Sequence, residues 1–255
     1  MKLTSLLPLA LACAPLQAAA VCSPDGLALF LQEDYKASAK AFERAVQTHP
    51  RDADCHVWLG RALGRRAERM SGLAKLGAMS VAGDVRESFE RAVEIDPANL
   101  EALQSLFAFY AEAPGIVGGG VDKAEPLVSR IAALDRAAGL RAQADLHRRA
   151  GRFEQAEAAL RQAVEIDPDD IGHHLSLASF LARQERFKES DAIYDALLAA
   201  HPRDPAVWFS FGKELARAGR RTAQARKLLN QYLSTPLPRP DAEPYSEARK
   251  LLEEL

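Results

Sequence analysis

The sequence has no excess of either charge, which argues against a nucleic-acid partner. Its 33 lysine and arginine residues are balanced by 35 aspartate and glutamate residues, so the formal net charge is −2. Proteins that hold nucleic acid by its phosphates carry a basic surface. With 255 residues, 48% of them hydrophobic, the chain is instead long enough to bury the core of an ordinary globular protein.

A clean apolar run of membrane-spanning length is also lacking. The first twenty residues, MKLTSLLPLALACAPLQAAA, carry one lysine, an apolar stretch and Ala18, Ala19 and Ala20. This order is typical of a secretory signal peptide. Pro8 and Pro15 interrupt the stretch, which is shorter than the roughly 20 apolar residues of a transmembrane helix. We therefore expect residues 1–20 to be a signal peptide. The mature chain is then expected to be exported, to the periplasm in the simplest case, and to have no stable membrane span after cleavage. A lipoprotein with Cys13 lipidated is the alternative.

Cysteines are few, and cleavage after Ala20 would leave two of the three, Cys22 and Cys55. An exported protein meets an oxidising compartment, where a disulfide between them is the natural expectation. Two separate buried thiols remain the alternative, because sequence cannot show the distance between the two residues.

Motifs for catalysis or for cofactor binding are missing. The glycines of FYAEAPGIVGGGVDKAE, residues 109–125, invite a phosphate-loop interpretation, but Val121, Asp122 and Lys123 follow them where a P-loop needs Lys and Ser or Thr. Asp122 and Glu125 instead predict a capping pair at the start of a helix. His173 and His174 are adjacent and cannot share a metal on a helix; we expect His174 to pack in the core. The sequence thus predicts no enzyme, no cofactor and no metal site.

What the sequence does have is an internal repeat. Apolar, alanine-rich stretches at helical spacing end in a proline four times, at Pro50, Pro97, Pro168 and Pro202, and the last two prolines are 34 residues apart. Within one unit, Leu177, Ala178 and Leu181 share a helix face with His174. A second helix is expected to turn Phe187, Ser190, Tyr194 and Leu197 inward. Each unit is therefore a pair of antiparallel helices closed by a proline.

Leu59 with Gly60, the turn glycines Gly151 and Gly219, the repeated alanines and the terminal prolines resemble the tetratricopeptide repeat. The resemblance covers nearly all of residues 21–255 and implies a single all-α domain, a right-handed α-solenoid of about six helix-turn-helix units. The units begin near Cys22, Ala53, Leu100, Ala137, Ile171 and Asp204. A last helix from Pro244 to Leu255, with an apolar stripe of Tyr245, Ala248, Leu251 and Leu252, is expected to cap the solenoid.

Two units depart from the common length. The second has thirteen extra residues at about 65–84, which are expected to lengthen both of its helices or to add a short one. The third carries the glycine-rich loop 114–121 between its helices. This combination of a long second unit and a glycine-rich loop in the third unit resembles exported bacterial tetratricopeptide proteins.

The resemblance also implies a binding surface, a concave groove lined by the first helix of each unit. The groove candidates are Trp58, Arg61, Arg141, Asp145, Arg148, Arg183, Phe209, Lys213 and Arg217. The later units are basic, so we expect an acidic or C-terminal segment of a protein partner, with Trp58 and Phe209 as apolar anchors. Solvated helix faces without a partner are the alternative.

By the same resemblance, the expected function is a scaffold for another protein, in envelope assembly or cytochrome maturation. The alternative is a solute-binding or transport accessory protein that uses a pocket enclosed by the solenoid and the second-unit insertion. The identity of the partner and the oligomeric state stay open.

Overall fold

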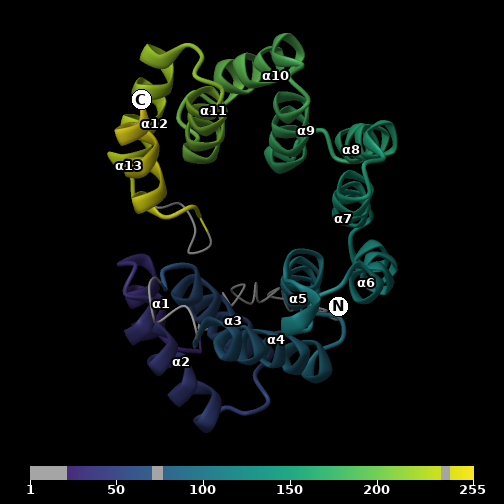
Figure 1. Cartoon of the computed structure of the whole chain (residues 1–255), viewed down its shortest axis with the longest axis vertical. Helices are drawn as coiled ribbons and strands as arrows, with labels where there is room; N and C mark the ends of the chain where they lie inside the picture. Colours follow the sequence, from purple (N-terminus) through teal and green to yellow (C-terminus); the bar gives the residue numbers. More distant parts are fainter. Residues whose placement is uncertain (1–21, 71–76, 237–241) are drawn as a thin grey trace, which may run out of the picture.

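A computed structural model describes residues 22–70, 77–236 and 242–255. These residues form thirteen α-helices, and no strand occurs among them (Figure 1). Six helix pairs follow one another: α1 (Pro24–Leu31) with α2 (Tyr35–Thr48), α3 (Ala53–Glu68) with α4 (Ala78–Ile95), α5 (Leu100–Glu112) with α6 (Val121–Leu134), α7 (Arg136–Arg149) with α8 (Phe153–Ile166), α9 (Ile171–Arg183) with α10 (Phe187–Ala200), and α11 (Pro205–Arg217) with α12 (Thr222–Leu233). A closing helix, α13 (Tyr245–Glu254), comes last. The predicted all-α solenoid is confirmed.

The start of each first helix is encoded beside the repeated prolines. Two residues after each proline stands an aspartate or asparagine whose side chain accepts a hydrogen bond from a backbone N–H in the first turn of the next helix. These N-cap residues are Asp52, Asn99, Asp170 and Asp204. The proline cannot continue the preceding helix, and the cap satisfies N–H groups that lack a partner within the helix. Proline and cap together thus fix the joint between successive units.

The turn inside a unit requires one residue with left-handed backbone. Gly151 and Gly219 hold φ of 71° and 61° there, and Glu33 and Glu185 hold φ of 63° and 59° at the corresponding turns. Glycine adopts this region freely, whereas a residue with a Cβ is disfavoured by roughly 1–2 kcal/mol. Arg221, in the same turn as Gly219, also holds a positive φ of 46°, so three of the four turns carry a conformational cost.

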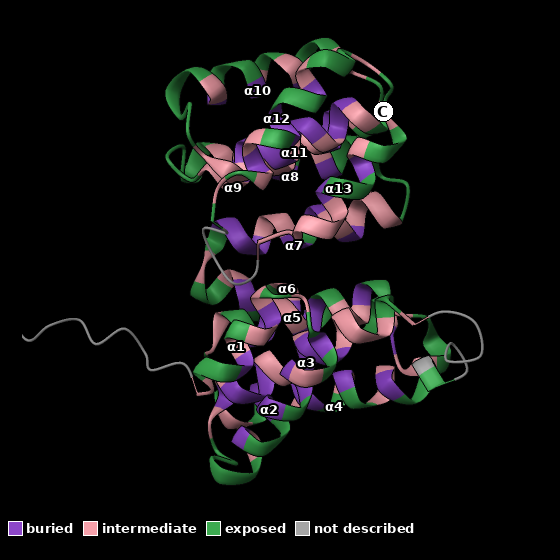
Figure 2. Ribbon diagram, turned by 90° about the vertical axis from the view of Figure 1, so that its left-hand side faces the viewer, coloured by how far each residue is buried: buried purple, intermediate pink, exposed green. Residues whose placement is uncertain are grey.

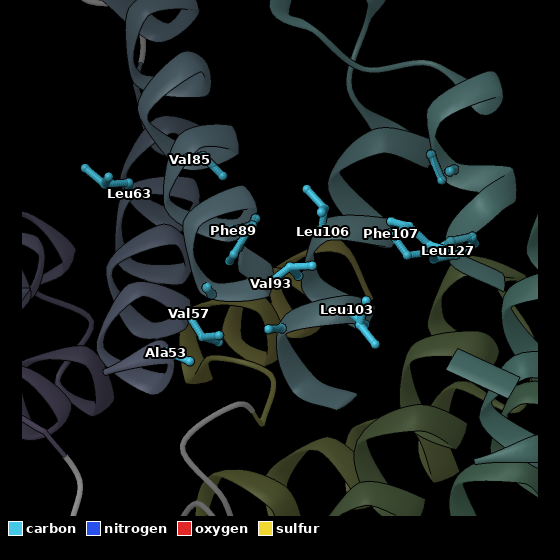
Figure 3. Packing of buried hydrophobic residues seen from close by; sticks show 14 of the residues in the cluster. Ala53, Val57, Leu63, Val85, Phe89, Val93, Leu103, Leu106, Phe107 and Leu127 are labelled. Atoms are coloured by element: carbon cyan, nitrogen blue, oxygen red, sulfur yellow. The ribbon is translucent and has the colours of Figure 1, made fainter. Parts of the chain in front are cut away.

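The core consists of three hydrophobic clusters that follow one another along the chain. Figure 2 shows that buried residues occur along the whole stack of helices. The first cluster extends from Phe30 to Leu146, the next joins α7, α8 and α9, and the last joins α9 through α13. Figure 3 shows the first cluster, where Phe89 and Val93 of α4 lie close to Leu103 and Leu106 of α5. Each unit buries its apolar face only against its neighbours, as expected of a solenoid.

The second and third units accommodate their extra residues in different ways. Helices α3 and α4 have 16 and 18 residues, against 13 and 14 in α9 and α10, so the second-unit insertion lengthens both helices. Its residues 71–76 lie outside the described part of the chain. In the third unit, residues Gly115–Val117 form a short 3-10 helix (η2) before α6.

The predicted capping pair of Asp122 and Glu125 is wrong. Helix α6 begins at Val121, and its N-cap is Gly120, with no side-chain hydrogen bond. The glycines explain why: Gly120 has φ of 151°, and a Cβ on Gly119 would lie 1.8 Å from the carbonyl oxygen of Ala113. The loop therefore needs glycine for its own path, which brings the chain into the helix before Asp122 is reached.

Covalent and apolar contacts secure the two ends. Cys22 is bonded to Cys55, with their Cα atoms 5.6 Å apart, which fastens the segment before α1 to α3. At the other end, Ala248 and Leu251 of α13 are buried against α11 and α12, and Tyr245 and Leu252 pack beside them. The predicted cap is thus present. The proposed signal peptide, residues 1–20, lies outside the described residues.

Candidate partner-binding groove

The first helices form the inner wall of a ring. Figure 1 shows the units arranged around an open centre, with α3, α5, α9 and α11 nearer to it than α4, α6, α10 and α12. The first helices therefore border the concave side. The exposure and the partners of their side chains decide which side chains could contact another molecule.

Four of the groove candidates converge on one cavity. It has a volume of about 350 Å³ and lies between α7, α9 and α11. Arg141, Asp145 and Arg148 line it from α7, and Arg183 lines it from α9. Three guanidinium groups thus share the site with a single carboxylate, a composition that favours an anionic ligand.

The three arginines of this cavity differ in their partners. Arg148 and the neighbouring Arg149 both form salt bridges to Asp145. Within the part of the chain that the structure describes, neither Arg141 nor Arg183 forms a salt bridge, and the buried Nε of Arg141 has no hydrogen-bond partner. A buried donor without a partner is unfavourable by about 1–3 kcal/mol. Arg141 and Arg183 are therefore the groups with charge to offer a ligand.

Serine hydroxyls complete the wall, and the sequence reasoning missed two of them. Ser176 and Ser210 line the cavity beside Ser179. Ser176 and Ser210 stand 34 residues apart, one repeat length, so the periodicity could have identified them. Ser176 donates to the carbonyl of Gly172, and Ser179 donates to the buried Glu214. Their protons are already committed, so the arginines remain the main donors of the site.

Phe209 is not an apolar anchor for a partner, contrary to the sequence-based expectation. Only 4% of its surface is exposed, its ring packs 5.0 Å from that of Tyr232, and Lys213 covers it at 5.1 Å. Trp58 is half-buried between Phe30 and Phe42, with the Arg61 guanidinium 4.8 Å from its ring centre. Both rings serve mainly to pack the repeats together.

The remaining cationic candidates are paired within the chain. Arg61 forms a salt bridge with Glu101 of the next unit. Lys213 lies 3.8 Å from Glu243, and Arg217 lies 3.9 Å from Glu247. Their spacing placed them on the concave face, but the acidic groups beside them come from distant parts of the sequence. The broad basic groove expected from the sequence is therefore reduced to the cavity around Arg141 and Arg183.

A histidine and two aspartates come close enough to one another to hold a metal. One ligand atom each from Asp167, Asp170 and His173 lie within 4.8 Å. Asp170 already caps α9, and burial, followed by the charge of Arg141, lowers the pKa of His173. A nearby guanidinium also opposes a second cation. The cluster is thus better explained as the polar joint between two units.

The prediction that His174 packs inward is wrong. His173 is the buried histidine, with 2% of its surface exposed. His174 is half-buried, and its Nε2 forms a hydrogen bond with the carbonyl oxygen of Pro168. The charged groups around His173 come from the preceding unit and from the start of α9, among them Arg141 and Asp170, so the preceding unit lies beside the α9 face that carries His173.

Among the described residues, no helix is both long enough and apolar enough to cross a membrane.

Comparison with known proteins identifies the repeat directly. Two family models described as tetratricopeptide repeat match the chain, one at residues 26–100 and 118–171, about half of its length, and the other at residues 147–209.

Solved structures show the same fold. A tetratricopeptide repeat protein from Parabacteroides merdae is 12% identical, with a TM-score of 0.62 over 90% of this chain and 80% of that one. A thermophilic tetratricopeptide protein of Thermus thermophilus is 22% identical, with a TM-score of 0.56 over 74% and 95% of the two chains.

One curated relative is similar over a short stretch. Cellulose synthase operon protein C of Pseudomonas fluorescens (strain SBW25) is 34% identical over 82 residues, which span 32% of this chain and 6% of that protein. The family models cover far more of the chain. The chain therefore belongs to the tetratricopeptide repeat family, whose members bind protein or peptide partners and are generally not enzymes.

Proposed function

We propose that this chain is an exported scaffold that holds an acidic segment of a partner protein on its concave face. The observation that carries the proposal is the cavity between α7, α9 and α11, where Arg141 and Arg183 form no salt bridge with any described carboxylate. A carboxylate of the partner would give both guanidinium groups charge-assisted hydrogen bonds and would supply an acceptor for the buried Nε of Arg141. The role is binding rather than catalysis.

The shape of the site supports a polypeptide ligand. The cavity is lined from the first helices α7, α9 and α11. The first helices of several units border the concave side (Figure 1) and would provide a continuous surface for an extended segment. An acidic side chain or a terminal carboxylate would enter the cavity while the flanking residues lie along the neighbouring units. Because Arg148 is shared with Asp145, the site would accept about one carboxylate group rather than a cluster.

A random-peptide display library tests the proposal. Peptides selected on the wild-type protein are expected to be enriched in aspartate, glutamate or an acidic terminus. Their affinity should fall at least about tenfold in Arg183→Ala and further in Arg141→Ala/Arg183→Ala, since removal of one partner of a desolvated charge pair weakens binding strongly. Fluorescence anisotropy with labelled peptides measures this, and circular dichroism checks folding.

The matched control is Lys188→Ala/Arg203→Ala, which removes two exposed cations outside the cavity and changes the net charge equally. It should leave affinity nearly unchanged. Peptides without acidic groups, or equal losses in both double variants, would refute the carboxylate site.

A small anionic solute is the second candidate, favoured by the cavity volume of about 350 Å³, which is at the lower end for ligand sites. This cavity lies far along the chain from the second-unit insertion where the sequence-based alternative placed it. A thermal-shift screen of small carboxylates and phosphates separates the two ligand classes, because a ligand that binds only the folded state raises its stability.

The export part of the proposal is supported by residues 1–20 and by the disulfide, which suits an oxidising compartment. Expression of the full chain, followed by fractionation and N-terminal sequencing, should give a periplasmic protein that starts at Val21. A cytoplasmic protein that retains Met1 would overturn this part alone.

A further inference from the structure

The two ends of the solenoid meet and close the ring. The backbone N–H of Ser246, in the first turn of α13, donates to Oε1 of Glu33 at 3.0 Å, across 213 residues of sequence. Arg69, directly after α3, binds both partners: it forms a salt bridge with the Glu33 carboxylate, and its Nη2 donates to Oγ of Ser246 at 2.8 Å. In Figure 1, α13 comes round to the side of α1 where this contact forms.

This joint differs in chemistry from the joints between successive units. Successive units share buried apolar clusters, whereas a cavity of about 490 Å³ lies at the ring closure and is lined mainly by charged side chains. Arg65 faces Glu243 across it at 3.6 Å, and Lys213 approaches the same carboxylate at 3.8 Å. Ion pairs that keep contact with solvent contribute little each and are screened by salt. The closure therefore depends on salt-sensitive contacts, whereas the joints between successive units depend on apolar burial.

The residue at the centre of the contact is conformationally costly. Glu33 occupies the left-handed turn position that glycine holds at Gly151 and Gly219. At this turn, glutamate is less favourable than glycine for the left-handed backbone, but its side chain supplies the carboxylate that α13 binds. Glu185 has the same backbone conformation and is exposed in the fifth unit, far along the chain from the closure.

We propose that Glu33, Arg69 and Ser246 form a reversible electrostatic latch that holds the ring closed. When these contacts break, the ring opens between the α1–α2 turn and α13. When the latch is shut, a polypeptide reaches the concave face only along the axis of the ring. When it is open, the same face is accessible from the side. The latch is independent of the ligand proposed above, and either proposal can fail alone.

The backbone N–H of Ser246 is a direct reporter of the latch. The first N–H groups of a helix have no partner within the helix. When the ring is closed, the hydrogen bond to Glu33 therefore protects the amide hydrogen of Ser246 from exchange with solvent. Glu33→Gly removes the carboxylate and at the same time relieves the left-handed backbone. It should therefore accelerate amide exchange at Ser246 by roughly tenfold or more, while the melting temperature stays equal or rises.

Glu185→Gly is the matched control, because it makes the same change at an equivalent turn away from the closure. It should raise the melting temperature similarly and leave exchange at Ser246 unchanged. A second variant, Ser246→Pro, removes both the N–H donor and the hydroxyl that accepts from Arg69, in the first turn of the helix where proline is best tolerated. Small-angle X-ray scattering should show a larger maximum dimension for Glu33→Gly and Ser246→Pro than for the wild type.

Salt provides an independent readout. From about 0.05 M to about 1 M NaCl, the wild type should approach the scattering profile of Glu33→Gly, which should itself change little. The proposal is overturned if Ser246 exchanges equally fast in the wild type and in Glu33→Gly. It is likewise overturned if the maximum dimension is the same in all four proteins, or if salt changes the wild type and Glu33→Gly equally.

Discussion

Gly60 determines how closely the two helices of the second unit approach. A Cβ on Gly60 would lie 2.5 Å from Cε1 of Phe89, whose ring packs directly over the glycine. Contacts this short do not occur between real carbon atoms, so the glycine is required by the position of Phe89 in the core. The Leu59–Gly60 pair seen in the sequence thus has a physical cause in packing between α3 and α4.

We predict that Gly60→Ala destabilises the protein by about 1–3 kcal/mol, because the new methyl group forces Phe89 out of place. Urea unfolding followed by circular dichroism measures this. Gly64→Ala, one turn later on the same helix, has nothing within 4 Å of the new Cβ. That variant should be neutral or stabilising by up to about 1 kcal/mol, because alanine favours helix more than glycine does. Equal effects of both variants would contradict the packing argument.

Helices are joined between units by contacts that repeat with the sequence. Arg186 forms a salt bridge with Glu157 of the preceding unit, and 34 residues later Arg220 does the same with Asp191. The first two units have in addition the disulfide from Cys22 to Cys55. A solenoid is held together only by neighbouring units, so its terminal units gain most from such extra links.

We predict that reduction of the disulfide lowers the free energy of unfolding by about 3 to 4 kcal/mol, the chain-entropy value for a loop of this length. Urea denaturation with and without reductant measures the effect. Cys22→Ser should lose the same stability and then show no further loss when reductant is added. A reductant effect that persists in Cys22→Ser would mean that Cys22 is not in the bond that is reduced.

The whole molecule is a ring whose closure depends on ionised groups. Burial raises the pKa of Glu33, but the hydrogen bonds from Ser246 and Arg69 lower it more, so the net pKa is below its ordinary value of 4.5. Tyr35 of α2 and Tyr232 of α12 also lie near this carboxylate, but neither carries a positive charge, so Arg69 is the cation that pairs with it. Because the pKa is depressed in the closed ring, closure is favoured by the ionised form.

We therefore predict that the ring stays closed near neutral pH, that closure weakens as the pH falls below about 4.5, and that the ring opens as the pH falls through the lower pKa that Glu33 has in the closed ring. Small-angle scattering over a pH series measures the opening, and far-UV circular dichroism distinguishes it from unfolding. Glu33→Gln should resemble the acid form already at neutral pH. A maximum dimension that is constant over the series in a folded protein would contradict this prediction.

Much of the fold could be predicted because its signals are local. The prolines, the N-cap residues and the apolar spacing lie within one unit, and repetition strengthened each of them. The errors concern contacts between units or backbone paths. Phe209 is covered by Tyr232 and Lys213, and the start of α6 follows the glycines rather than Asp122. Spacing along a helix identifies a face but not what covers that face.

The sequence by itself determined the helix pairs, their order and their stacking, because each depends on residues fewer than about forty positions apart. The conspicuous glycines before α6 belong to that local level, as a loop that needs glycine for its path. Only the tertiary structure decided which charges are free and that the ring closes. Ion pairing joins residues as distant as Arg65 and Glu243, and the curvature that brings them together is the sum of small rotations between units.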